Sequence, residues 1–211
     1  MGKDLFLDTY IRKLPDPLIV KENTQIGVFV HQVIAEWFKN RVSLFPVSLD
    51  DVYHKVLKTK QGSAYFHNFF NEETKNYLDN FAEMFKSLDG EVFASEKQYS
   101  LKMDDDLTLT GKPDFLMKNG PTLLIVDVKT GGRPPHEKYG MDHWAQLKYF
   151  AWLLSSHFEA QEMVGAYLLL KGNKISEVKI TKKDMAETEK YFRAKAGEIS
   201  EFIEKNKILM A

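Results

Sequence analysis

The chain has 211 residues, and its 29 Lys plus Arg against 30 Asp plus Glu give a formal net charge of −1. Hydrophobic residues at 44% and charged residues at 28% are globular proportions, which exclude a disordered or collagen-like protein. The charge balance neither predicts nor forbids a nucleic-acid partner, because a local basic groove can lie within a neutral total. The absence of cysteine excludes disulfides, thiolate zinc sites and Cys-ligated iron–sulfur clusters.

Membrane and targeting signals are also missing from the sequence. No uncharged apolar run reaches the roughly 18 residues that cross a bilayer, and the N-terminus lacks a signal-peptide h-region. We therefore expect a soluble, intracellular protein with no membrane partner. Because no linker or repeat divides the chain, we expect one domain over residues 1–211.

Residues 1–90 are predicted to be mainly helical. Apolar residues recur at helical spacing after Thr24, so we expect a first helix from this cap to about Asn40. Ser48 has the chemistry of an N-cap and predicts the start of a second helix. A third helix is expected to end at Asp89-Gly90, where glycine permits the helix to stop.

The hydrophobic period then changes to about two, which predicts a β-meander of three strands over residues 91–129. The acidic residues 104–106 and Asn119-Gly120 separate these strands. Downstream, periodicity and turn residues predict four further elements: a helix over 141–157, strands near 163–170 and 175–180, and a closing helix over 181–211.

The second and third strands carry most of the charged residues of interest, and their turn predicts how they pair. If Asn119-Gly120 is a two-residue turn, the facing residues of the hairpin can be counted outward from it. The predicted facing pairs are Lys118 with Pro121, Asp114 with Ile125, and Lys112 with Asp127.

In this register Asp114 is the diagonal neighbour of Asp127. Residues two apart on a strand share a face, so Asp114, Asp127 and Lys129 should converge on one side of the sheet. Burying an unpaired carboxylate is costly, so something must compensate Asp127. One interpretation is an Asp–Lys salt bridge at a strand end. The other is a divalent cation held by both carboxylates, with Lys129 placed to stabilise charge on a phosphate.

Three motifs carry a resemblance to a known family. Pro113-Asp114 followed by Asp127-Val128-Lys129 resembles the signature of the PD-(D/E)XK nuclease superfamily. Upstream, the segment from Gly27 to His31 resembles the Gly-x-x-x-His element of the RecB-like branch. Downstream, the segment from Gln146 resembles its Gln-x-x-x-Tyr motif, although Tyr149 stands one residue before the family position.

The resemblance implies an α/β fold with a restriction-endonuclease-like core: a mixed sheet containing the antiparallel three-strand meander, flanked by helices, with extra N-terminal helices. It implies a stand-alone, divalent-metal-dependent DNA nuclease, expected to be an exonuclease of replication, recombination or repair. The expected cofactor is one or two Mg²⁺ or Mn²⁺ ions, with no iron–sulfur cluster. Expected partners are DNA and other replication or recombination proteins. The alternative is a catalytically inactive DNA-binding or protein-interaction module on the same fold.

The resemblance also assigns roles to individual residues. Glu96, on the first strand, is a weaker candidate, because it could also be a solvated charge at the sheet edge. His31 could also be an ordinary helix residue. The implied metal ligands are His31, Asp114, Asp127 and the backbone carbonyl of Val128; the implied catalytic residues are Asp114, Asp127 and Lys129; and the implied substrate contacts are Gln146, Tyr149 and Arg133.

Overall fold

A mixed five-stranded sheet forms the centre of the computed structural model, which describes residues 22–41, 48–60, 72–103, 108–135 and 142–206. Neighbouring strands are antiparallel except for the parallel pair β5 and β6. The helix between β5 and β6 supplies the crossover that a parallel pair needs. In spatial order the strands are β1 (Glu91–Ser95), β4 (Phe115–Asn119), β5 (Thr122–Lys129), β6 (Glu162–Leu169) and β7 (Lys174–Ile180).

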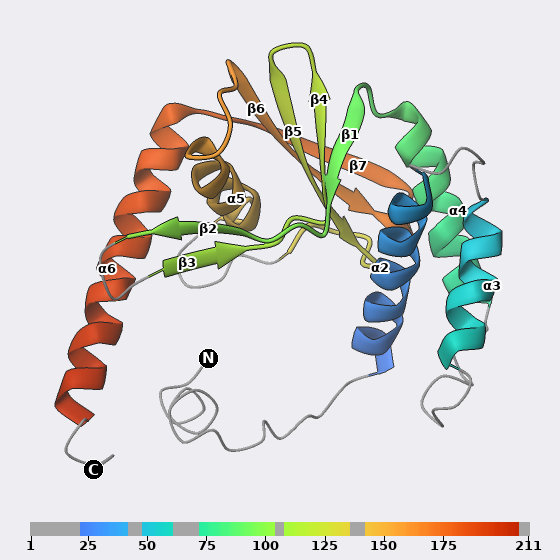
Figure 1. Cartoon of the computed structure of the whole chain (residues 1–211), viewed down its shortest axis with the longest axis horizontal. Helices are drawn as coiled ribbons and strands as arrows, with labels where there is room; N and C mark the ends of the chain where they lie inside the picture. The colour runs from blue at the N-terminus through green and yellow to red at the C-terminus, as the bar shows by residue number, and fades with distance from the viewer. Residues whose placement is uncertain (1–21, 42–47, 61–71, 104–107, 136–141, 207–211) are drawn as a thin grey trace.

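Helices cover both faces of the sheet (Figure 1). Alternate residues of β5 belong to two separate cores, with Val126 and Val128 in one and Ile125 in the other. Because both faces are packed, the apolar run of β5 is that of a central strand, as the predicted α/β fold requires. One face carries α2 (Glu22–Arg41), α3 (Leu49–Lys60) and α4 (Glu72–Ser87), and the other carries α5 (Ala145–Ser155) and α6 (Lys182–Asn206).

Two helix starts follow from capping residues. The Ser48 Oγ accepts a hydrogen bond of 3.1 Å from the Asp51 backbone N–H, which confirms the predicted start of α3. Thr181 caps α6 in the same way, with 3.1 Å between its Oγ1 and the Asp184 backbone nitrogen. The cap predicted at Thr24 is wrong, because α2 begins two residues earlier at Glu22.

The remaining boundaries differ in detail from the predicted ones. The helix predicted over 141–157 is shorter, because Trp144 N–H bonds to Asp142 Oδ1 in a turn before α5 begins. After β6, the short helix η3 (Leu170–Gly172) ends at Asn173, whose φ of 43° makes the predicted turn. None of the helices in the described ranges combines the length and apolarity that a membrane span requires.

The predicted three-strand meander is divided in the structure. The first predicted strand breaks at Glu96, whose φ is 51°, and the second breaks at Pro113, which has no N–H for a ladder. The outer halves pair with each other as a separate two-stranded sheet of β2 (Tyr99–Lys102) and β3 (Thr108–Gly111). Only β1, β4 and β5 form the meander of the main sheet, and the acidic residues at 104–106 lie outside the described residues.

The predicted hairpin register was also wrong. Asn119 pairs with Thr122, so the turn consists of Gly120 and Pro121. The reason is chemical: Pro121 lacks the N–H that a closing pair donates, whereas Gly120 readily takes its φ of 53°. The shift moves facing partners by two residues, which keeps every side chain on its predicted face. The pairing ends with Phe115 opposite Val126, and the same register extended by one residue would place Asp114 opposite Asp127.

Candidate active site

Asp114 lies in the break before β4 and is held from two sides. Its Oδ2 accepts a hydrogen bond of 2.6 Å from the Val128 backbone N–H on β5. Its backbone carbonyl accepts a second of 2.9 Å from the Glu96 N–H. Because Pro113 ends the ladder just before this point, the Asp114 carboxylate can turn toward groups outside the sheet.

Asp127, Lys129 and Gln146 form a closed set of contacts at the end of β5. Gln146, on α5, donates from Nε2 to Asp127 Oδ1 at 2.9 Å, and its Oε1 accepts from Lys129 Nζ at 3.0 Å. Lys129 Nζ also lies 2.6 Å from Asp127 Oδ2. Asp127 is only 3% exposed, so this ammonium group is its principal compensating charge. Lys129 Nζ is also 5.9 Å from the ring centroid of buried Tyr167.

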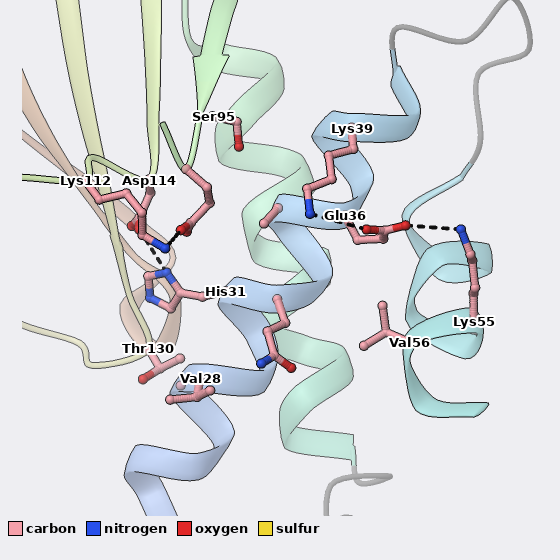
Figure 2. Close-up of a pocket in the computed structure, with 14 residues that line it drawn as sticks. Val28, His31, Glu36, Lys39, Lys55, Val56, Ser95, Lys112, Asp114 and Thr130 are labelled. Atoms are coloured by element: carbon pink, nitrogen blue, oxygen red, sulfur yellow. Dashed lines mark hydrogen bonds and ion pairs between the residues drawn. The ribbon is translucent and has the colours of Figure 1, made fainter. Parts of the chain in front are cut away.

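His31 reaches the site from α2, which lies on the opposite face of the sheet from α5. Its Nδ1 is 3.1 Å from Asp114 Oδ1 (Figure 2). An ionised carboxylate only accepts hydrogen bonds, so Nδ1 carries the proton and Nε2 is the ring nitrogen left for a ligand. The start of α2 lies close to the end of β5, since a Cβ on Gly27 would be 3.5 Å from Thr130 Oγ1.

Glu96 completes a group of possible metal ligands. One ligand atom from each of His31, Glu96 and Asp114 lies within 4.8 Å of the others. The bend at Glu96, where φ is 51°, turns the chain out of β1, and strained residues of this kind concentrate at functional sites. The Glu96 carboxylate also pairs with Lys112.

Asp114 raises the pKa values of both His31 and Asp127. Burial opposes the charged imidazole of His31, but the hydrogen bond and charge of Asp114 outweigh it and raise the pKa. Burial and the charge of Asp114 raise the pKa of Asp127 to about 6, although Lys129 opposes the change. Both shifts favour the more positive protonation state, as expected of a site that binds a cation.

The residues present fit a divalent cation. His31, Glu96 and Asp114 together offer an imidazole nitrogen and two carboxylates, which is a donor set for a divalent cation, whereas Asp127 lies outside this group. Asp127 Oδ2 is buried and, within the described part of the chain, accepts no hydrogen bond of good geometry despite its contact with Lys129. Such an oxygen retains a lone pair for a metal ion.

The remaining two sequence candidates lie at the periphery. Tyr149 OH donates to the Thr110 carbonyl at 2.8 Å, and the Tyr149 ring packs 4.7 Å from Phe192 on α6. Arg133 is exposed in the bends after β5. Gly111, two residues before Pro113, has a packing role, because a Cβ on it would lie 2.7 Å from Leu153 Cδ2.

Comparison with known proteins identifies the family. The family model described as "PD-(D/E)XK nuclease superfamily" matches residues 5–207 of the chain. The chain belongs to the PD-(D/E)XK nuclease superfamily. Members of this superfamily use divalent metals, which agrees with the group of possible metal ligands around Asp114. No curated protein matches the chain.

A solved structure described as "Crystal structure of SSO0001" is 12% identical, with a TM-score of 0.32 over 76% of this chain and 71% of that one. Similarity at this level adds nothing to the assignment. The superfamily agrees with the observed mixed sheet and its two helical layers.

Sequence reasoning underrated two residues of this site. Lys112 was considered only for its strand register, yet it is the ion-pair partner of Glu96. Glu96 was a weaker candidate, yet it lies beside His31 and Asp114. A positive φ at glutamate has no sequence signal, because that conformation depends on the Asp114 carbonyl that anchors the Glu96 N–H.

Proposed function

We propose that this member of the superfamily is a RecB-like DNA nuclease that acts as an exonuclease in replication, recombination or repair. The observation that carries the proposal is the meeting of His31, from the Gly-x-x-x-His segment, with Asp114 of the Pro-Asp motif at 3.1 Å. This contact between residues 83 positions apart in sequence supports the proposal.

In the proposed mechanism His31, Asp114 and Asp127 hold one or two Mg²⁺ or Mn²⁺ ions, with Glu96 as a further ligand. A bound ion would polarise the scissile phosphate and lower the pKa of a water nucleophile. The Val128 N–H points to Asp114, and the N–H and C=O of one strand residue lie on the same edge. The Val128 carbonyl therefore faces the same side and can contribute an oxygen.

Lys129 is the group that we assign to the developing negative charge. Its ammonium lies next to the Asp127 carboxylate and would stabilise charge on the phosphate oxygens as the bond breaks. Gln146 holds the Lys129 Nζ and the Asp127 Oδ1 in fixed relation, so both groups are oriented before substrate arrives. Arg133 and Tyr149 remain proposed contacts for the nucleic acid outside the reaction centre.

The experiment is cleavage of DNA labelled at either end, as linear duplex, circular duplex and single strand, with Mg²⁺ or Mn²⁺. We expect mononucleotides or short products from linear DNA, no cutting of circles, and no activity for Asp127→Asn. Cutting of circles would overturn the exonuclease assignment. Binding without cleavage of any substrate would instead favour an inactive DNA-binding module.

A further inference from the structure

The outward face of α2 forms the floor of an open groove of about 1070 Å³ that begins at the candidate active site. Residues at four-residue spacing line it from one end of the helix to the other: Gly27, His31, Ala35 and Lys39. This spacing places them in one row along the helix. The ends of β1 and β4 form one wall of the groove, and α3 forms the other (Figure 2).

The two ends of the groove have different charges. At one end are the carboxylates of Glu96 and Asp114 with His31, where the reaction is proposed. At the other end, Glu36 binds two lysines, with its Oε1 3.1 Å from Lys55 Nζ and its Oε2 3.7 Å from Lys39 Nζ. Between the two ends the floor is formed by Gln32 and the small side chain of Ala35.

The lysine pair is presented outward. The side chains of Lys39 and Lys55 are 71% and 58% exposed, whereas that of Glu36 is 29% exposed. Hydrogen bonds from Lys55 and Asn40 lower the pKa of Glu36, so its carboxylate stays charged and holds both ammonium groups. Two outward cations around one inner anion leave a net positive charge for a ligand.

The distance between the ends suits a nucleic-acid strand. His31 and Lys39 are eight residues apart on α2, which is about 12 Å at 1.5 Å per residue. A strand stacked as in B-form DNA rises about 3.4 Å per nucleotide, so the distance spans about three such steps. Along the way, Gln32 Oε1 and Ser95 Oγ are buried at the groove and have no hydrogen-bond partner among the described residues.

We propose that this face of α2 is the track for the strand that leads away from the scissile phosphate, with Lys39 and Lys55 contacting a phosphate about three nucleotides from it. The track rests on the proposed nuclease function at the His31 end. Gln32 and Ser95 line the groove beside the intervening nucleotides, and the small side chain of Ala35 lets the strand lie close to the helix. The ligand is a single strand, since His31 and Lys39 lie in one row along the floor of a groove that has a wall on each side.

The test compares the double variant Lys39→Ala/Lys55→Ala with wild type in binding of a fluorescent 20-nucleotide single strand by anisotropy, without metal. We expect the Kd to rise at least about fivefold, and the salt slope of log K to fall by about 1.4, which is 0.7 for each lost charge. In cleavage of the same strand the KM should rise while kcat stays within about twofold.

Two matched variants separate a track from a structural link between α2 and α3. Lys179→Ala/Lys183→Ala removes two other lysines that pair with glutamates, and should leave the Kd unchanged. Glu36→Gln removes the anion beneath the lysines and should lower the Kd. A merely structural role would lower the unfolding midpoint in Glu36→Gln and in the lysine variant, without moving the Kd of either.

Failure of the track differs from failure of the nuclease function. If wild type cleaves DNA and the Lys39/Lys55 variant binds DNA as tightly as the control variant, the proposed track is wrong but the nuclease function stands. Wild type that binds DNA through these lysines but cleaves none would overturn the nuclease function and leave the track. Wild type that binds no DNA at low salt would overturn the track as well.

Discussion

Gln146 on α5 donates a 2.9 Å hydrogen bond to Asp127 on β5. The same amide accepts a hydrogen bond from Lys129, so one neutral side chain holds a carboxylate and an ammonium group together. Gln146 was expected to contact substrate. Its two hydrogen bonds favour a positioning role, in which it acts on the reaction through Asp127 and Lys129.

Replacing Gln146 separates these two roles. If Gln146 positions Asp127 and Lys129, Gln146→Ala should lower kcat about 10- to 100-fold with little change in KM, because its partners lose their orientation. Gln146→Glu keeps the acceptor for Lys129 but loses the donor to Asp127, and should also be impaired. Gln161→Ala, at an exposed position outside the site, is the control. A rise in KM with normal kcat would show substrate binding instead.

Variants of the three motif residues should all lose activity but should differ in their stability. We expect Asp114→Asn, Asp127→Asn and Lys129→Ala to abolish cleavage. Asp127→Asn should increase the free energy of unfolding by about 1–2 kcal/mol at pH 7. The reason is that burial raises the pKa of the Asp127 carboxyl to about 6, so its ionised form destabilises the folded protein. Lys129→Ala should be destabilised, because it leaves Asp127 without its ion-pair partner.

Urea unfolding and cleavage assays on the same preparations would check both effects. The stabilisation by Asp127→Asn should disappear below about pH 4, where the wild-type residue is protonated in the folded and unfolded states alike. Activity near the wild-type level in any of the three variants would contradict the role assigned to that residue.

The metal preference tests His31 and Glu96 as ligands. Because Mn²⁺ accepts nitrogen more readily than Mg²⁺, we expect His31→Ala to shift the Mn²⁺ midpoint of activity upward by about tenfold, with a smaller effect on the rate at saturation. Glu96→Gln should shift it in the same direction. Calorimetric titration of Mn²⁺ without DNA gives an independent reading. An unchanged midpoint in Glu96→Gln would show that Glu96 only pairs with Lys112.

Asp184 should make the stability of the α5–α6 contact depend on pH. Partial burial opposes its ionisation, but hydrogen bonds from Lys148 and Thr181 outweigh it and lower the pKa to about 2. A carboxyl whose folded pKa lies below its usual value of 3.8 stabilises the fold above that value and loses this effect as pH falls toward 2.

Asp184→Asn should therefore be about 1–2 kcal/mol less stable at pH 7, and the difference from wild type should shrink between about pH 4 and 2. Urea unfolding across this range is the measurement. Lys183→Ala, which loses only an exposed pair with Glu187, should cost less than about 0.5 kcal/mol. A gap that persists at pH 2 would show that the charge of Asp184 is not its source.

Local chemistry was sufficient to predict much of the fold. Apolar periodicity located the helices and the buried strand β5, and the capping residue Ser48 located the start of α3. The two-residue alternation of a strand also placed Asp127 and Lys129 on one face. These features depend on neighbours within a few residues, so the sequence carries them directly.

Hairpin pairing was predicted less well, although the information was present. Pro121 has no N–H and excludes the closing pair that was expected, and Pro113 interrupts the second strand. Both are local effects of proline. The separate pairing of β2 with β3 is different, because it depends on which surface of the sheet α5 occupies.

The amino-acid sequence by itself determined which residues carry the nuclease motifs, because residue type and spacing along the chain define them. Only the tertiary structure decided that Glu96 lies beside His31 and Asp114, that Gln146 bridges Asp127 and Lys129, and that Lys39 and Lys55 lie along the groove from the site. The reason is physical: these meetings depend on how α2 and α5 pack on opposite faces of the sheet, and that packing is set by the summed burial of two cores rather than by any local preference.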